Sequence, residues 1–100
     1  MKRYENNDCF FFVGDNAREN WQLLDQCEPH DLLFHLKDSS SAYVVAVRKR
    51  LCDHNQEDIR YAASLFNNNN KSVLYTQVRN VVKGKRTGEV IVNEYKTIRI

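Results

Sequence analysis

The longest purely apolar block near the start of the chain is residues 9–13, Cys-Phe-Phe-Phe-Val. A short continuous run of residues with high β propensity predicts a buried β-strand, and Gly14 follows at its end. The phenylalanines are core residues in the favoured interpretation and base-stacking platforms in the other. Residues 1–8 are polar and mixed in charge, which predicts a flexible N-terminal arm or a poor edge strand.

A first helix is predicted from Asn16 to about Gln26. Asp15 or Asn16 can cap its start, and Asn16 with Glu19, three positions later, resembles a capping box. Pro29 prevents the helix from continuing. Helical spacing assigns Ala17, Trp21 and Leu24 to the inner face with Leu23 beside them, and directs Arg18, Asn20 and Gln22 elsewhere.

Residues 31–37 alternate with a period of two, which predicts a strand. The alternation places Leu32, Phe34 and Leu36 on one face and Leu33, His35 and Lys37 on the other. Turn residues at 38–41 lead into a second strand at 43–48, so the two strands are expected to pair as an antiparallel hairpin.

A second helix is predicted after Asn55, a potential N-cap, because its apolar residues recur at i, i+3, i+4 and i+7. These residues are Ile59, Ala62, Ala63 and Phe66. The asparagine run at 67–70 is expected to end the helix in the left-handed conformation.

The remaining residues predict three strands and a basic loop. A strand is expected at 73–78, a loop at 79–88, and a final hairpin of 89–92 with 95–100 around Asn93 and Glu94. The predicted fold class is therefore α+β: a mostly antiparallel sheet with two short helices packed on it, in a single domain over residues 9–100.

Charge is uneven along the 100 residues, although the formal net charge is only +2. Residues 71–100 hold seven cations and two carboxylates, a net +5, which leaves −3 for residues 1–70. A basic segment on a nearly neutral domain is either a nucleic-acid footprint or an ordinary solvated surface.

The sequence offers little chemistry for catalysis, a metal or a cofactor. Cys9, Cys27 and Cys52 are widely spaced without a C-x-x-C motif, so neither a disulfide framework nor a zinc site is expected. No nucleophile motif or phosphate-binding glycine loop is present, and we expect no enzyme and no cofactor. Short apolar runs and a polar start predict no membrane span and a cytoplasmic protein.

Two positions could still bind a nucleotide. His35, in mid-strand, either hydrogen-bonds or stacks on a nucleotide, or is a half-buried histidine satisfied by a neighbour. The amides that follow Gly14 at the helix start can bind an anion, supplemented by Arg18 and Asn20, although Asp15 places a negative charge there.

Four stretches in a fixed order resemble the NFACT-R domain, the RNA-binding module of NFACT proteins. That family includes ribosome-quality-control factors and bacterial proteins once called fibronectin-binding. The stretches are Val13–Asn20 (VGDNAREN), Asp31–Asp38 (DLLFHLKD), Ser40–Val45 (SSAYVV), and Thr87–Val90 continued by Tyr95–Ile98, with Val73–Thr76 also similar. The resemblance covers about residues 9–100. The chain departs from the family where Asp15 replaces a basic residue, Leu33 a tryptophan and Tyr43 a histidine.

The resemblance implies non-catalytic binding of RNA, either tRNA or rRNA, in translation or ribosome quality control, with ribosome association. The alternative is a protein-interaction module that docks on a ribosomal or other protein. One expected RNA contact area comprises Asn16, Arg18, Asn20, His35 and Lys37. Further phosphate contacts are expected from Arg48, Lys49, Arg50, Arg79, Lys83, Lys85 and Arg86.

Overall fold

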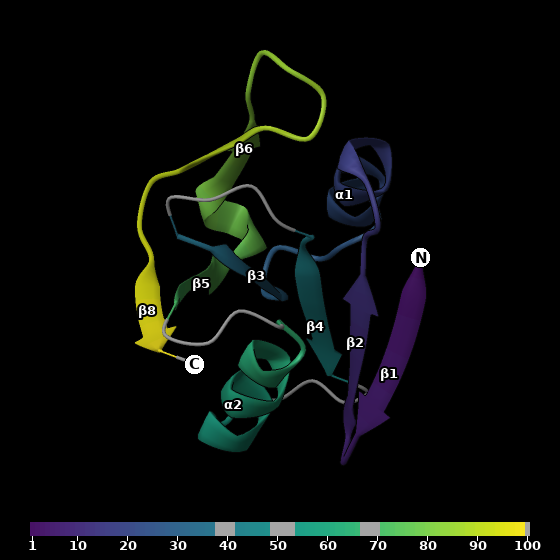
Figure 1. The fold of residues 1–100 in the computed structure, drawn as a ribbon, viewed down its shortest axis with the longest axis vertical. Helices are drawn as coiled ribbons and strands as arrows, with labels where there is room; N and C mark the ends of the chain where they lie inside the picture. Colours follow the sequence, from purple (N-terminus) through teal and green to yellow (C-terminus); the bar gives the residue numbers. More distant parts are fainter. Residues whose placement is uncertain (38–41, 49–53, 67–70, 100) are drawn as a thin grey trace.

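The computed structural model describes residues 1–37, 42–48, 54–66 and 71–99. The elements, in chain order, are β1 (Lys2–Asn6), β2 (Cys9–Val13), α1 (Ala17–Asp25), β3 (Leu32–Leu36), β4 (Val44–Arg48), α2 (Gln56–Ser64), β5 (Ser72–Gln77), the 3₁₀ turn η1 (Val78–Asn80), β6 (Val81–Lys83), β7 (Val90–Val92) and β8 (Lys96–Arg99). Within these ranges, six strands form one sheet in the order β1-β2-β4-β3-β5-β8, and β6 pairs with β7 in a small second sheet (Figure 1). All neighbouring strands are antiparallel. The chain therefore has the predicted α+β fold.

Both faces of the large sheet are covered, because its central strands carry apolar residues on each side. Helix α2 covers one face, where Ile59 and Ala62 pack against Phe11, Phe34 and Val73. On the opposite face, Leu23 of α1 packs with Leu33, Tyr43 and Val45, and residues of β6 and β7 complete this second core. The alternating faces predicted for residues 32–37 are confirmed in β3, since Leu33 lies in the second core and Leu32, Phe34 and Leu36 in the first.

Asparagine caps start both helices, as predicted. The side chain of Asn16 accepts a hydrogen bond from the Glu19 amide at 3.0 Å, while the Glu19 carboxylate accepts from Asp15 rather than from the cap itself. At α2 the capping box is complete, because Asn55 and Asp58 each accept from the other's backbone amide.

The inner face of α1 differs from the prediction. Its buried residues are Asn20 and Leu23, whereas Ala17 is exposed and Trp21 half-buried. The polar Asn20 faces inward because its side-chain oxygen accepts a hydrogen bond from the Tyr43 amide. The periodicity of apolar residues cannot predict the burial of a polar residue.

Residues 2–6 form edge strand β1 and not a flexible arm, which corrects the first of the two alternatives for residues 1–8. The strand pairs with β2 in register from Lys2–Val13 to Asn6–Cys9. Its residues are mostly exposed, as expected for a polar edge strand beside the apolar β2. The edge position explains why the segment lacks a hydrophobic pattern.

The predicted final hairpin is wrong. Strand β7 pairs with β6, and β6 lies inside the segment that was expected to be a loop. Strand β8 pairs with β5 at the edge of the large sheet. Val90 of β7 packs in the second core and Ile98 of β8 in the first, so the two strands bury their apolar residues on opposite faces. Two short strands that pair only with each other are marginally stable, so packing on an existing core stabilises each of them more.

The turn predicted at 38–41 and the helix end predicted at 67–70 lie outside the described residues.

Candidate functional site

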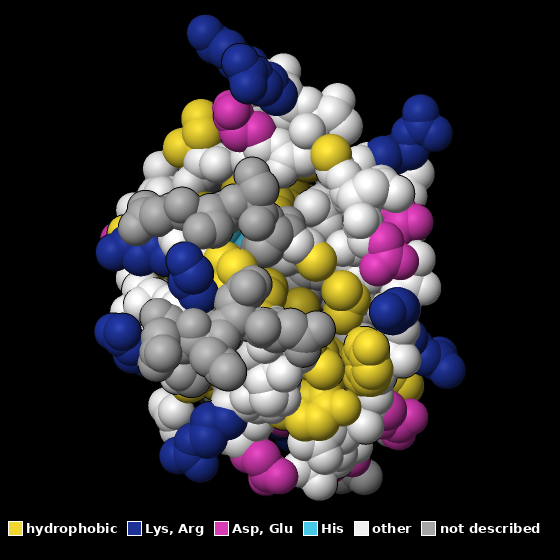
Figure 2. Space-filling view, in the orientation of Figure 1, with side chains coloured by type: hydrophobic (Ala, Val, Ile, Leu, Met, Phe, Trp, Pro, Cys, Tyr) yellow, Lys and Arg dark blue, Asp and Glu magenta, His cyan; other side chains and the backbone are white. Residues whose placement is uncertain are grey.

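Cations predicted to bind phosphate gather where the β6–β7 hairpin lies against α1. Lys85 and Arg86 are exposed in the hairpin loop, and Arg18 is exposed on α1. Lys83, at the end of β6, is also exposed. Figure 2 shows Lys and Arg side chains projecting at the top of the molecule, where Figure 1 places this loop. We call Arg18, Lys83, Lys85 and Arg86 the basic hairpin surface.

Direct contacts hold the hairpin on α1. The indole Nε1 of Trp21 donates to the backbone oxygen of Glu89 at 3.0 Å. Lys83 Nζ lies 2.6 Å from the Asp25 carboxylate and 5.1 Å from the centre of the Trp21 ring. These contacts from Trp21 and Asp25 fix where the hairpin presents its cations. Trp21 was predicted only as an inner-face residue of the helix, and no role was predicted for Asp25.

The hairpin loop is braced by Glu89 and needs glycine at position 88. The Gly84 amide donates to the Glu89 backbone oxygen at 2.8 Å, and the Lys85 amide donates to the Glu89 side chain at 3.1 Å. Gly88 has a φ of +88°, and a Cβ there would lie 2.6 Å from that of Ala17. Glycine thus allows both the left-handed turn and the close approach to α1.

The start of α1 is already occupied by carboxylates. Met1 places its terminal ammonium 3.1 Å from both Asp15 and Glu19, and the Glu19 side chain also accepts from the Asp15 amide. That backbone hydrogen bond, followed by the ammonium, lowers the pKa of Glu19. Asn16 uses its side-chain oxygen for capping. This helix start is consequently a poor phosphate site, in line with the negative charge noted at Asp15.

Asn20 lies inside the protein and holds three segments together. Only 5% of it is exposed, and its Oδ1 accepts a hydrogen bond from the Tyr43 amide at 3.2 Å. Gly14 packs so closely that a Cβ would lie 2.3 Å from the same oxygen, and the Gly14 amide donates to Tyr43. Asn20 therefore positions α1 against β2 and β4 and does not face a ligand.

His35 stacks on Tyr43, with ring centres 5.4 Å apart. Its Nδ1 lies 2.9 Å from the Leu36 carbonyl oxygen, to which it must donate, and its buried Nε2 has no hydrogen-bond partner among the described residues. Burial lowers the pKa of His35. The Tyr43 hydroxyl donates to the backbone oxygen of Gly88. The arrangement is that of a half-buried histidine under the hairpin, with Leu36 as the hydrogen-bond partner of its Nδ1. The partners expected for it, Asp38 or a neighbouring serine, lie outside the described residues.

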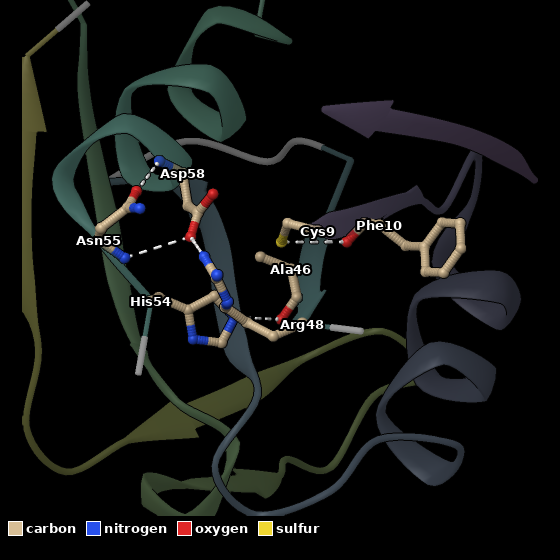
Figure 3. A network of polar contacts seen from close by, with 7 residues as sticks. All are labelled: Cys9, Phe10, Ala46, Arg48, His54, Asn55 and Asp58. Carbon is tan, nitrogen blue, oxygen red and sulfur yellow. Dashed lines mark hydrogen bonds and ion pairs between the residues drawn. The ribbon is translucent and has the colours of Figure 1, made fainter. Parts of the chain in front are cut away.

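The other predicted contacts are dispersed. Arg48 forms an ion pair with the buried Asp58, and 11% of its side chain is exposed, so it serves the interior and not a phosphate (Figure 3). Lys37 is half-buried, with its ammonium 5.9 Å from the centre of the Tyr95 ring. Arg79 is exposed in η1. Lys49 and Arg50 lie outside the described residues.

Polar groups also meet beneath the start of α2. His54 Nε2 donates to the Ala46 carbonyl oxygen at 2.9 Å, beside the Arg48–Asp58 pair (Figure 3). Burial lowers the pKa of His54 and raises that of Cys9 to about 12, so both are neutral at pH 7. Among the residues that the structure describes, no cluster of His, Cys, Asp and Glu side chains could hold a metal ion.

No helix within the described ranges combines the length and the hydropathy needed to cross a membrane. Neither known family profiles nor curated protein sequences match the chain. The fold is similar to the C-terminal part of the fibronectin/fibrinogen-binding protein from Streptococcus suis, with a TM-score of 0.81 at 22% identity. That similarity covers 98% of this chain and 44% of the other, so the chain spans less than half of that structure.

Proposed function

We propose that this chain is a non-catalytic RNA-binding module whose basic hairpin surface contacts phosphates. The proposal is carried by the docking of the β6–β7 hairpin on α1, which presents the exposed Lys85 and Arg86 beside a helix with Arg18 exposed. Exposed cations attract phosphates without reading sequence, and release of counterions drives the binding.

A translation context and kinship with NFACT-R domains belong to the same proposal. They are supported by the ordered stretches from Val13–Asn20 to Tyr95–Ile98. The predicted RNA contacts differ in exposure: Asn20 is buried and His35 half-buried, whereas Lys83, Lys85 and Arg86 are exposed. We therefore assign RNA contact to the cations and a structural role to Asn20.

The test is salt-dependent binding of single-stranded RNA by fluorescence anisotropy. If the basic hairpin surface neutralises about four phosphates, log K should fall against log salt with a slope of about −3. The double variant Lys85→Ala/Arg86→Ala should flatten this slope by about 1.4, because two phosphate contacts are lost.

The charge-matched control is Lys2→Ala/Lys71→Ala, which removes two exposed cations, one in β1 and one just before β5. It should keep the wild-type slope. Absence of binding at low salt, or an equal loss in both double variants, would contradict the proposal.

The alternative, docking on a protein, is favoured by one feature of the same hairpin. Val82 and Ile91 are cross-strand partners and are 53% and 54% exposed, an apolar pair without cover. The structurally similar Streptococcus suis protein is itself named for binding fibronectin and fibrinogen. A pulldown with and without nuclease separates the two functions: a partner lost with nuclease supports RNA binding, and one retained supports protein docking. The double variant Val82→Ser/Ile91→Ser should lose the binding of a protein partner and should keep the binding of RNA.

A further inference from the structure

A cleft of about 770 Å³ opens on the side of the molecule away from α1. Its lining residues come mainly from the start of α2, from β5 and η1, and from the segment that enters β8. Figure 1 shows where α2, β5 and β8 lie in the fold. Its volume lies within the range of small-molecule sites in proteins. None of the predicted RNA contacts that the structure describes lines the cleft, and its chemistry differs from that of the basic hairpin surface.

The cleft has an apolar floor and is also lined by two tyrosines. Leu32 of β3 and Ile59 of α2 line it and are each only 8% exposed. Tyr75 and Tyr95 also line it, and Tyr75 is held from one side by Phe34, with ring centres 5.5 Å apart. Aliphatic side chains beside aromatic rings suit a flat ligand that gains from stacking and from leaving water.

Hydrogen-bonding groups that line the cleft are mostly neutral. The side chains of Gln56, Gln77 and Asn80 offer amide donors and acceptors. His54 donates its Nε2 proton to the Ala46 carbonyl, so Nδ1 is the nitrogen left to accept from a ligand. Burial lowers the pKa of His54, which keeps that nitrogen unprotonated at neutral pH.

One edge of the cleft is held rigid by a chain of hydrogen bonds. Asn80 Nδ2 donates to Thr76 Oγ1 at 3.1 Å, and Thr76 donates to the backbone oxygen of Glu94. Asn80 thereby presents its amide oxygen as an acceptor. Charged side chains among the described lining residues are Glu94 and Lys96, which offset each other. Because the two charges offset each other, the cleft favours a flat, neutral ligand with donors and acceptors on its edge. Lys96 can bind a phosphate attached to such a ligand.

The cleft wall is joined to the β6–β7 hairpin through Asn80. The hairpin leaves the cleft wall at Asn80 and returns at Asn93, whose amide donates to the Asn80 backbone oxygen at 3.0 Å. Arg79, exposed beside Asn80, supplies a cation between them. A strand bound by its phosphates to the hairpin loop can follow the hairpin to the cleft.

We propose that the cleft receives one unpaired base of a single-stranded RNA held by the basic hairpin surface. This inference rests on the proposed function. Stacking of an unpaired base on aromatic rings, with hydrogen bonds to its edge, is a common mode of RNA recognition. The tyrosines contact the face of the base, while Gln77 and Asn80 contact its edge. The hairpin supplies attraction to any RNA, and the cleft supplies preference among bases.

The first test compares two tyrosine variants by anisotropy on short homopolymeric RNAs of each base. Tyr95→Ala removes a cleft ring that is 46% exposed, and the control Tyr4→Ala removes a 37% exposed ring on β1. We expect Tyr95→Ala to weaken binding of the preferred homopolymer about fivefold or more, the effect of losing one stacked base. The salt slope should not change, since no phosphate contact is lost. Equal affinities for the two variants would overturn the inference while leaving the proposed function intact.

A second test does not depend on the hairpin. Adenosine, uridine, cytidine and guanosine monophosphates are titrated into the ¹⁵N-labelled wild-type chain. We expect shifts at the Thr76, Gln77 and Tyr95 amides that differ between bases and are reduced in Gln77→Ala. Shifts confined to Lys85 and Arg86, or identical for the four nucleotides, contradict a base site. Loss of RNA binding together with retained base-dependent shifts would instead refute the proposed function.

Discussion

His35 shows how strongly a single side chain depends on its surroundings. Its Nδ1 is satisfied by the Leu36 carbonyl, its ring lies on Tyr43, and its Nε2 is buried. Burial disfavours the charged imidazolium and so lowers the pKa of His35, although the Leu36 carbonyl works against this shift. The residue that most resembles a nucleotide contact in the sequence is thereby tied to the stability of the fold.

This burial predicts a pH dependence of stability. The pKa of His35 is lowered in the folded state from its ordinary value near 6.5, so the fold favours the neutral ring. Its contribution is fully present above about pH 6.5 and is lost as the pH falls below that value. Urea unfolding at pH 7.5 and 5.5 should show lower stability at pH 5.5, with a smaller decrease in His35→Phe.

His54 acts in the same direction, since burial also lowers its pKa. Part of the decrease should therefore remain in His35→Phe. The control is His30→Phe, at a histidine side chain that is 46% exposed, and it should show the full wild-type decrease. An unchanged pH dependence in His35→Phe would contradict the assignment.

Arg48 is the second residue whose role is decided by burial. It ends β4 beside other cations in the sequence, but its partner is Asp58, whose side chain is 1% exposed. We predict that Arg48→Met lowers the free energy of unfolding by about 3 kcal/mol, because it leaves a buried carboxylate without its counter-charge. Chemical denaturation measures this. The control Arg60→Met, at an exposed position of α2, should change stability by less than about 0.5 kcal/mol.

At the scale of elements, the β6–β7 hairpin is the unit on which the proposed function depends. Two strands of three residues are marginal by themselves. Val81 and Val90 pack in the second core, and Trp21 donates to Glu89, so the hairpin is stable only where it lies against α1 and the sheet.

We predict that Gly88→Ala undocks the hairpin. The substitution introduces a side chain at a left-handed residue and drives its Cβ to within 2.6 Å of that of Ala17. Trp21 is the only tryptophan of the chain, so its fluorescence emission should shift to longer wavelength as the indole becomes solvated.

The matched control is Gly84→Ala, in the same loop. There the nearest atoms belong to the flexible side chain of Glu89, which can move aside. Its emission should stay near that of the wild type. A Gly88→Ala spectrum identical to the Gly84→Ala spectrum would refute the docking role of Gly88.

Prediction from sequence succeeded for elements with local signals. Asn16 and Asn55 each cap a helix as expected, because a capping side chain bonds to amides only three residues away. It failed for β7 and β8. The partner of β8 is β5, which is distant in the chain, and the partner of β7 is β6, which lies in the segment predicted to be a loop. Alternating valines and isoleucines are equally suited to a hairpin between them and to pairing with β6 and β5.

At the scale of the whole molecule, the large sheet is covered on both faces and closed at one edge by a polar strand. β1 separates solvent from β2, where Phe11 is completely buried. Unpaired apolar edge strands promote association between molecules. The exposed, charged residues of β1 make it a suitable outermost strand.

Removal of residues 1–6 should therefore cause self-association. The truncated chain would present β2, with its Phe-Phe-Phe core, as an unprotected edge. Size-exclusion chromatography should show dimers or larger species at concentrations where the wild type is monodisperse. Tyr4→Ala keeps the backbone of β1 and should elute with the wild type. A truncated chain that elutes as a monomer of unchanged stability would show that β1 is dispensable.

The sequence by itself determined the helices, their caps, the strands of the centre and the α+β class, because those depend on periodicity and on hydrogen bonds within a few residues. It also indicated which segment is basic. Only the tertiary structure decided which polar residues turn inward, as Asn20 and Arg48 do, and which strands the short β7 and β8 join. It also assembled the cleft, whose walls come from residues as far apart as Leu32 and Tyr95. These outcomes depend on which groups satisfy each other after the chain has packed, and that information is not local.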